Sequence, residues 1–258
     1  MTARGASDPG PRPAAAPRPA GVPTGDLPGW HQTYREDFAR GAPLGGVAAV
    51  YGADMAGYSG LSDTSGRGTY LPSRVLSVTN GSLDWYVHSE AGRHLVAAPI
   101  PMGYAGQTFG RYSVRFRSDP LPGYKIAFLL WPTSDRWDEG EIDWPEGDLN
   151  GRMSPASAVR GSFANGAMTF DPPVRSWSAT NSAGWHVATT EWTPGKVRWF
   201  WDDSLVTETT ISSGVPTTPM RWTLQAETAI GGPAPAGSVS GHLAVDWVTA
   251  YSYAPGTH

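Results

Sequence analysis

Short runs of β-branched and aromatic residues, separated by glycine, proline, asparagine and aspartate, limit what this 258-residue chain can fold into. Such runs are typical of β-strands, and the Asn80-Gly81 pair between two of them is a strong signal for a tight hairpin. We find no amphipathic segment of helix length with a 3.6-residue period. Strands are expected at residues 33–38, 74–79, 82–87, 95–99, 110–117, 124–131, 140–144, 159–163, 185–193, 196–201, 204–210, 221–228 and 242–251. The sequence therefore predicts an all-β protein with two packed antiparallel sheets.

The composition argues against several classes of function. The formal net charge is −4, whereas nucleic-acid binding requires a basic surface, so no nucleic-acid partner is expected. The chain contains no cysteine, which excludes disulfides, thiolate metal ligands and a cysteine nucleophile. No apolar run approaches the ~20 residues of a membrane span, so no membrane partner is expected either. The 12 tryptophans, 32 glycines and 24 prolines favour a turn-rich β domain with an exposed aromatic surface.

Residues 1–29 differ in composition from the rest of the chain. They contain seven of the 24 prolines, together with many Ala, Gly and Arg residues and almost no large apolar side chain. Such a segment cannot bury a core and is typical of an extended linker or tail. The sequence therefore predicts a disordered tail over residues 1–29 and one folded domain over residues 30–258.

Three acidic residues lie close together in the segment GEIDWPE at residues 140–146. In a strand, residues two apart share a face, so Glu141 and Asp143 point the same way, whereas Glu146 points the other way. One extra residue in a β-bulge restores the phase, and Pro145 lies where such a bulge is expected. With the bulge, all three carboxyl groups face one side. Two carboxyl groups about 5–5.5 Å apart are what a retaining glycosidase uses as nucleophile and as acid/base.

Acidic residues at this density also occur in segments without catalytic function. A solvated loop has a similar composition, and so does a loop that binds calcium through oxygen ligands. The surroundings favour a sugar-binding cleft instead, because the segment follows an apolar run at residues 126–130 and lies among three tryptophans. These are Trp131, Trp137 and Trp144, whose rings can stack on the apolar faces of sugars.

The acidic segment resembles the signature of glycoside hydrolase family 16, which reads Glu-x-Asp-x-x-Glu in the bulged, laminarinase-like branch. Other segments are similar to the family in order and spacing: YREDF at 34–38, FGRYSVRFR at 109–117, WHVATTEWTP at 185–194, VRWFWDD at 197–203 and VDWVTAY at 245–251. The resemblance covers residues 30–253. It implies a β-jelly-roll sandwich of two curved antiparallel sheets with a cleft on the concave face. It also implies cleavage of β-1,3 or β-1,4 bonds in glucans or galactans, with retention of configuration.

The resemblance further implies roles for particular residues. Glu141 matches the nucleophile, Glu146 the acid/base, and Asp143 the acid between them. Neighbouring carboxylates repel one another, so the three are expected to titrate as a coupled set that retains a proton. The strand that carries Gln225 and Glu227 matches one that crosses the cleft, so these two side chains are expected to bind sugar hydroxyl groups.

A structural calcium ion is another expectation from the resemblance. Family members often hold calcium on the convex face, at the first and last strands, where Asp37 and Asp246 lie in this chain. Carboxylate oxygens suit this ion, although two acids on paired strands are also typical of a solvated surface. The expected reaction itself requires no cofactor.

Two departures from the family bear on the substrate. Pro145 replaces an apolar residue that is often methionine, which is compatible with a bulge. The segment 159–163, expected as the strand after the acidic segment, lacks the histidine of many glucanases, which weakens a specific prediction of β-1,3-glucan. Loops around the cleft determine sugar and linkage, so the sequence leaves the polysaccharide open.

The resemblance implies a secreted, extracellular hydrolase that acts on a polysaccharide, although no signal-peptide segment is visible. A monomer is the default expectation. Two alternatives remain open. A transglycosylase of the same fold uses the same acids but transfers the glycosyl group to a sugar. A non-catalytic carbohydrate-binding jelly roll has no need of all three acids, which favours the enzyme.

Overall fold

The computed structural model describes residues 21–149, 151–173, 179–180 and 184–256. The helices in these ranges are short: α1 (Val47–Tyr51), α2 (Pro72–Val75), η1 (Gly52–Met55), η2 (Trp137–Glu139) and η3 (Ser212–Gly214). None of the described helices is long and apolar enough to cross a membrane. The strands account for the architecture.

The larger sheet contains ten strands within the described ranges. They are β1 (Trp30–Glu36), β2 (Gly68–Tyr70), β3 (Leu76–Thr79), β4 (Ser82–Glu90), β5 (Arg93–Val96), β6 (Gly110–Ser118), β11 (His186–Thr193), β12 (Lys196–Trp201), β13 (Ser204–Thr209) and β15 (Gly241–Tyr253). Their order is β13-β12-β11-β6-β15-β4-β5-β2, with β1 also paired to β15 and β3 to β4. All pairs are antiparallel except that of β2 and β5.

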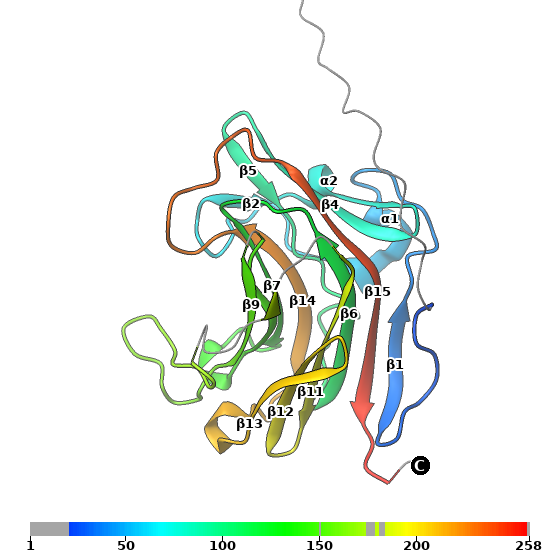
Figure 1. Cartoon of the computed structure of the whole chain (residues 1–258), viewed down its shortest axis with the longest axis vertical. Coiled ribbons are helices and arrows are strands. Elements are labelled where there is room, and N and C mark those ends of the chain that lie inside the picture. The colour runs from blue at the N-terminus through cyan, green and yellow to red at the C-terminus, as the bar shows by residue number, and fades with distance from the viewer. Residues whose placement is uncertain (1–20, 150, 174–178, 181–183, 257–258) are drawn as a thin grey trace, which may run out of the picture.

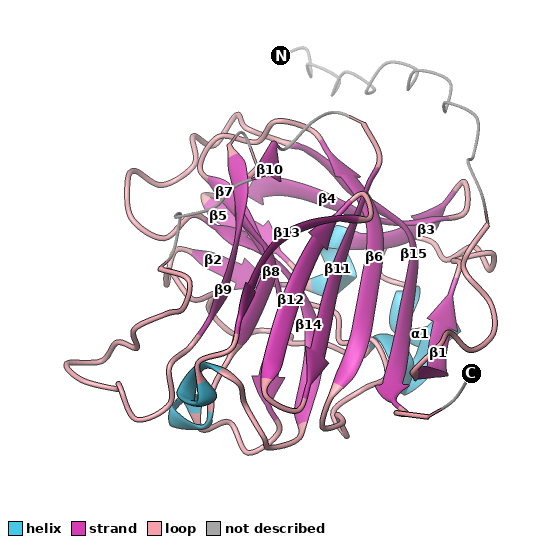
Figure 2. Cartoon of the chain, turned by 60° about the horizontal axis from the view of Figure 1, so that its bottom comes forward, coloured by secondary structure: helices cyan, strands magenta, loops and turns pink. Residues whose placement is uncertain are grey.

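The smaller sheet contains five strands within the described ranges, in the order β10-β9-β8-β7-β14. They are β7 (Tyr124–Pro132), β8 (Ile142–Asp148), β9 (Arg152–Ser157), β10 (Ala179–Thr180) and β14 (Met220–Thr228). Figure 1 shows β7, β9 and β14 in one layer and β6, β15 and β1 in the other, and Figure 2 shows β12, β11, β6 and β15 of the larger sheet side by side. The all-β, two-sheet prediction is therefore confirmed.

The core lies between the two sheets and is built from alternate residues of each strand. On β7, Ile126, Phe128 and Leu130 are buried in the core cluster, and on β14 Trp222 and Leu224 are buried in the same cluster. Successive side chains of a strand point to opposite faces. The intervening residues of β7 and β14 therefore face the open side of the smaller sheet, which is where the cleft lies.

One expected strand is wrong. Residues 159–163 form a turn, and the strand that follows β8 is β9 (Arg152–Ser157). Gly161 has φ = +79°, which breaks an extended segment, and Arg160 donates hydrogen bonds to the carbonyl oxygens of Ser212 and Ser213 instead of pairing in a sheet. Pro155 makes β9 inconspicuous in the sequence, because proline is rare inside sheets. Like 159–163, β9 contains no histidine.

The N-terminal region was predicted as a tail over residues 1–29. Residues 1–20 lie outside the described part of the chain, whereas residues 21–29 pack along β1. The amide nitrogen of Gln32 donates to Asp26 Oδ1 at 2.8 Å, its side-chain nitrogen donates to the carbonyl oxygen of Pro23 at 2.9 Å, and Leu27 and Trp30 exchange backbone hydrogen bonds. The ordered domain therefore begins before residue 30.

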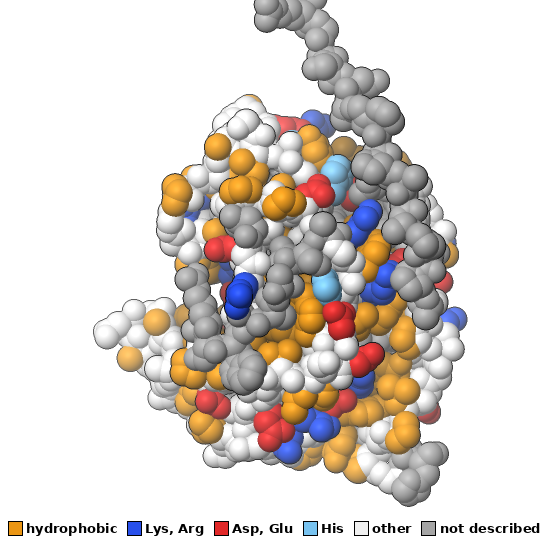
Figure 3. All heavy atoms as spheres, in the orientation of Figure 1, with side chains coloured by type: hydrophobic (Ala, Val, Ile, Leu, Met, Phe, Trp, Pro, Cys, Tyr) orange, Lys and Arg blue, Asp and Glu red, His pale blue; other side chains and the backbone are white. Residues whose placement is uncertain are grey.

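The surface charges are mixed. On the face shown in Figure 3, the described Lys and Arg side chains are interspersed with Asp and Glu. That face offers no basic stripe of the kind that nucleic-acid binding requires.

Candidate active site

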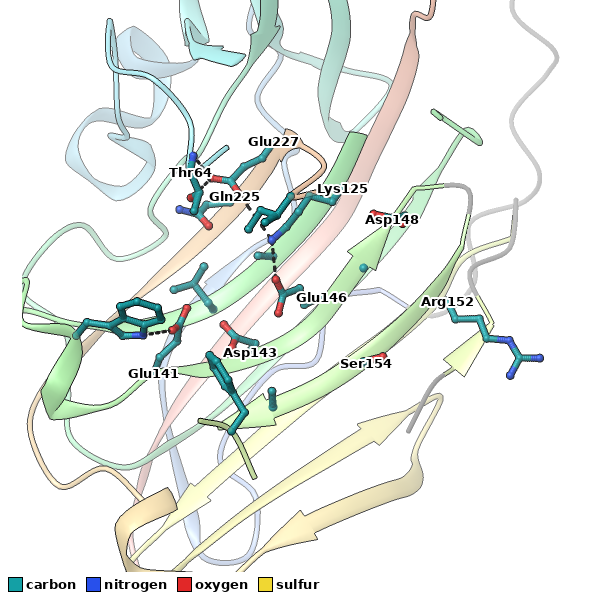
Figure 4. A pocket seen from close by; sticks show the side chains of 17 residues that line it. Thr64, Lys125, Glu141, Asp143, Glu146, Asp148, Arg152, Ser154, Gln225 and Glu227 are labelled. Atoms are coloured by element: carbon teal, nitrogen blue, oxygen red, sulfur yellow. Dashed lines mark hydrogen bonds and ion pairs between the residues drawn. The ribbon is translucent and has the colours of Figure 1, made fainter. Parts of the chain in front are cut away.

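A β-bulge in β8 brings the acidic residues into phase. Asp143 pairs with Ala156 of β9 and Glu146 pairs with Ser154, so β8 has one residue more than β9 between these two pairs. The same extra residue is present against β7. Pro145 lies within this irregular stretch, and the predicted bulge is confirmed. As Figure 4 shows, Glu141, Asp143 and Glu146 all point into one pocket.

The cleft over the smaller sheet has two halves, which meet at Glu141. One half, the acid half, has a volume of about 590 Å³, and the other, the aromatic half, has a volume of about 600 Å³. Charged side chains that line the acid half are Lys125, Asp143, Glu146, Asp148, Arg152 and Glu227. The aromatic half is lined among others by Tyr58, Tyr104, Trp131, Asp135 and Arg221. Residues common to both halves are Thr64, Leu129, Trp137, Glu141 and Gln225.

The backbone and a tryptophan fix Glu141. The preceding Gly140 has φ = +122°, a region that is essentially restricted to glycine, and a Cβ atom there would lie 2.7 Å from Cγ of Pro216. The indole nitrogen of Trp137 donates a hydrogen bond to Glu141 Oε2 at 2.5 Å. Burial, reinforced by the charge of Glu146, raises the pKa of Glu141 to about 7. The hydrogen bond from Trp137 opposes this rise.

Asp143 lies between the two glutamates and is only 2% exposed. Burial, followed by the charges of Glu141 and Glu146, raises the pKa of Asp143 well above its usual range. Its carboxyl group shares a hydrogen bond with Glu141. Since Asp143 is the member that retains a proton, it is the donor and Glu141 accepts. Asp143 therefore favours the ionised form of Glu141.

Glu146 has a cationic partner that the sequence did not predict. Lys125 Nζ lies 2.6 Å from Glu146 Oε1, and the Glu146 side chain remains 26% exposed to the cleft. Lys125 comes from β7, on the strand face shared by Ala127, Leu129 and Trp131. The sequence contained one signal for a charged group in the cleft. Lys125 is the single lysine in an otherwise apolar strand and follows the same alternation as Trp131.

The three tryptophans predicted to bind substrate separate into two groups. Trp131 and Trp137 line the cleft, with ring centroids 6.4 Å apart. The substrate-binding prediction is wrong for Trp144. This residue is 3% exposed, and its indole nitrogen donates a hydrogen bond to the carbonyl oxygen of Phe200. The cause is strand alternation, because Trp144 follows Asp143 directly and so points to the opposite face.

Gln225 and Glu227 both face the cleft side of β14, but they differ in exposure. Gln225 is partly exposed and lines both halves of the cleft. Glu227 is 1% exposed, and its Oε1 accepts hydrogen bonds from the hydroxyl groups of Tyr70 and Thr64. The predicted sugar-binding role stays a prediction for Gln225, whereas Glu227 lies beneath the surface of the cleft.

The two acids expected at a calcium site have other partners. Asp246 is 4% exposed, and its Oδ2 lies 2.5 Å from Nη1 of Arg115. Asp37 Oδ1 accepts a hydrogen bond from the amide nitrogen of Ala39. Calcium requires about six to eight oxygen ligands, which can include backbone carbonyl oxygens, and no group of three or more His, Cys, Asp or Glu side chains among the described residues could hold a metal ion. The calcium site at Asp37 and Asp246 therefore stays a prediction.

Sequence reasoning also missed a cationic residue in the aromatic half. Arg221 on β14 is 4% exposed, donates to the hydroxyl oxygen of Tyr58 at 2.9 Å and pairs with Asp135. Its guanidinium group lies 5.5 Å from the ring centroid of Tyr104, which is 48% exposed. Loop residues far apart in sequence make this cluster, so no local pattern predicted it.

Comparison with solved structures identifies the fold. The laminarinase from Rhodothermus marinus has a TM-score of 0.69 and 22% identity, over 88% of this chain and 99% of that protein. A β-glucanase from Bacillus licheniformis has a TM-score of 0.64 and 15% identity, over 91% and 99%. An endo-β-1,3-glucanase from Pyrococcus furiosus has a TM-score of 0.64 and 16% identity, over 92% and 100%. No match is found among curated proteins.

The fold and the cleft are those of a β-jelly-roll glycoside hydrolase. The sequence profile described as Glycosyl hydrolases family 16 matches residues 104–249, more than half of the chain. The chain therefore belongs to this family and is a glycoside hydrolase, as the resemblance predicted.

Proposed function

We propose that the protein is a retaining endo-β-glycosidase of the bulged, laminarinase-like branch, which hydrolyses a neutral β-glucan or galactan. The supporting observation is that the bulge in β8 directs Glu141, Asp143 and Glu146 into one cleft. Because the cleft extends on both sides of Glu141, a polysaccharide can continue past the reacting bond in both directions, as endo cleavage requires.

The first half-reaction uses Glu141 as nucleophile. A carboxylate oxygen of Glu141 attacks the anomeric carbon while the bond from that carbon to the departing sugar oxygen breaks. Glu146 gives its proton to the departing oxygen, which leaves as a hydroxyl group. Asp143 and Trp137 donate hydrogen bonds to Glu141 and so favour its ionised form before the attack.

The second half-reaction returns the enzyme to its starting state. A water molecule attacks the anomeric carbon of the glycosyl ester, and Glu146 accepts a proton from that water. The bond between the anomeric carbon and Glu141 breaks, so Glu141 is again a carboxylate and Glu146 again carries a proton. Two displacements at one carbon give net retention of configuration.

The charge of the cleft bears on the substrate class. Among the described residues, the acid half is lined by five acidic side chains, counting Glu141 and the protonated Asp143, but by only two basic ones. A negative cleft repels sulfated or uronic polysaccharides. We therefore propose a neutral substrate. Because such polymers are too large to enter a cell intact, we also propose that the protein acts outside the cell.

The test is the release of reducing sugar from laminarin, lichenan, β-1,3-galactan and agarose, with carrageenan as the sulfated substrate. We expect activity on at least one neutral polymer, absent from E141Q. E139Q is the matched control, because Glu139 lies two residues away and bonds to Ser134 outside the acid triad. Product anomers followed by NMR report retention. Unchanged activity of E141Q, or inversion, contradicts the mechanism, and products longer than the substrate indicate transglycosylation instead.

A further inference from the structure

A buried chain of alternating charges crosses three strands beneath the cleft. Lys125 on β7 is 6% exposed and lies opposite Glu227 on the neighbouring strand β14. Its Nζ lies 2.6 Å from Glu146 Oε1 on β8 and 3.8 Å from Glu227 Oε2. Figure 4 shows Lys125 between the two carboxylates. A buried lysine requires such partners, since a buried, unpaired ammonium group is strongly destabilised.

Glu227 holds the far end of this chain in place. Its Oε1 accepts hydrogen bonds from the Tyr70 hydroxyl group and from Thr64, through the Oγ1 at 2.7 Å and the amide nitrogen at 3.3 Å. Burial, and then the charge of Glu227, raises the pKa of Tyr70 above its usual range. Tyr70 therefore remains a donor, and Glu227 presents Oε2, which has no hydrogen-bond partner among the described residues, towards Lys125.

Lys125 is thus a fixed cation. Burial alone would lower the pKa of Lys125, but the carboxylates of Glu146 and Glu227 outweigh burial and raise it. The other charged groups that line the pocket around Glu146 are Glu141 just before β8, Asp143 and Asp148 on β8, and Arg152 on β9. Lys125 is the cation in hydrogen-bond contact with Glu146.

This contact has opposite effects on the two half-reactions. A cation next to Glu146 favours its ionised form. It therefore opposes the protonated state that the first step needs and assists the ionised state that accepts a proton from water in the second. The hydrogen bond from Lys125 to Oε1 also restricts the rotation of the Glu146 side chain.

We propose, on the basis of the function proposed above, that Lys125 is a positioning residue for the reaction. Held by Glu227, it orients the Glu146 carboxyl group in the cleft and limits activity at high pH. Neither the acid triad nor the family match assigns a role to Lys125.

The test compares pH profiles of kcat/KM for hydrolysis of the best substrate. In K125M, the alkaline limb is expected to move to higher pH by about one pH unit or more, the low end of the effect of an opposite charge at this distance. K125R keeps the charge and is expected to retain the wild-type limb. The control is K196M, because the chain has no other lysine and Lys196 is 41% exposed in a surface pair with Glu208. An alkaline limb of K125M at the wild-type pH overturns the proposal.

A second variant covers the case in which K125M does not fold, since that substitution leaves Glu227 buried beside a neutral side chain. K125M/E227Q removes both charges, so no unpaired buried charge results. The same alkaline shift is expected, and a wild-type profile overturns the proposal.

The proposed function is tested separately by E146A. Azide or a substrate with a good leaving group is expected to restore its turnover, and a failure of both removes the acid/base role of Glu146. Rescue of E146A together with an unchanged limb in K125M overturns the role of Lys125 alone.

Discussion

The carboxyl groups of Glu141 and Asp143 are held where ionisation is costly. Burial is the main cause of the raised pKa of both groups, and repulsion between neighbouring carboxylates adds to it. A nucleophile must nevertheless be ionised, and hydrogen bonds from Asp143 and Trp137 favour that form of Glu141. Ionising these buried carboxyl groups therefore costs free energy, and the cost depends on pH. Two predictions for single residues rest on this dependence.

The first prediction concerns stability. The pKa of Glu141 rises from 4.5 to about 7 on folding, so the folded state binds more protons than the unfolded state between these values. Stability is then greatest below about pH 4.5 for this group and falls as the pH rises through about 7. E141Q lacks this loss, so its Tm is expected to exceed that of the wild type at pH 8 by about 2–4 °C per kcal/mol recovered. Differential scanning calorimetry at pH 5 and pH 8 checks this, and a gap that does not grow with pH contradicts it.

The second prediction concerns the Trp137 N–H group. W137F keeps an aromatic ring but removes the donor to Glu141, whose pKa then rises further. The acidic limb of the kcat/KM profile is expected to move to higher pH by about 1 unit. A shift of this size corresponds to the loss of about 1.4 kcal/mol of stabilisation of the ionised form. W131F is the control, because Trp131 lies beside Trp137 and lines the aromatic half. If both variants show the same limb, the hydrogen bond does not tune the nucleophile.

At the scale of the element, the bulge in β8 determines which way Glu146 points. Glu146 follows Asp143 by three positions, whereas their partners on β9 are two positions apart. The extra residue compensates for a spacing that a regular strand would direct into the core. The face of the sheet to which the Glu146 carboxyl group points therefore depends more on the number of residues in the bulge than on the identity of Pro145.

Deletion and insertion at the bulge are expected to differ. Without Pro145, Glu146 follows Asp143 by two residues, so a regular strand still directs it into the cleft. We expect this deletion to retain measurable hydrolysis, well above that of E146A. An alanine inserted after Pro145 places Glu146 four residues after Asp143. If the bulge persists, Glu146 points towards the core, and if a regular strand forms, Glu146 lies about 6–7 Å further along the cleft from Glu141. Both arrangements are expected to abolish activity. Reducing-sugar assays on both variants decide this, and loss of activity in both would show that exact bulge geometry matters more than phase.

At the scale of the molecule, the sequence predicted the features that depend on residues close together in the chain. Alternation and one bulge placed Glu141, Asp143 and Glu146 on one face. The same alternation, applied strictly, would have placed Trp144 in the core. The contact between Lys125 and Glu227 joins β7 and β14, about a hundred residues apart in sequence, and no sequence pattern states which strands are neighbours.

The start of the domain gives the last prediction. Composition predicted a tail to residue 29, but hydrogen bonds to β1 place the start of the folded domain before residue 30. Asp26 Oδ1 accepts a hydrogen bond from the amide nitrogen of Gln32, and the amide nitrogen of Gly25 donates to Gln32 Oε1. A chain that starts at Gly21 keeps these contacts, and its Tm is expected to match that of the full chain. A chain that starts at Trp30 loses them, and with them about 0.5–1.5 kcal/mol per hydrogen bond. Thermal melts of the two chains, with D26A as a point variant in the full chain, measure the difference. Equal Tm values for all of them would place the boundary at residue 30 after all, and the segment 21–29 would then lie against β1 without stabilising it.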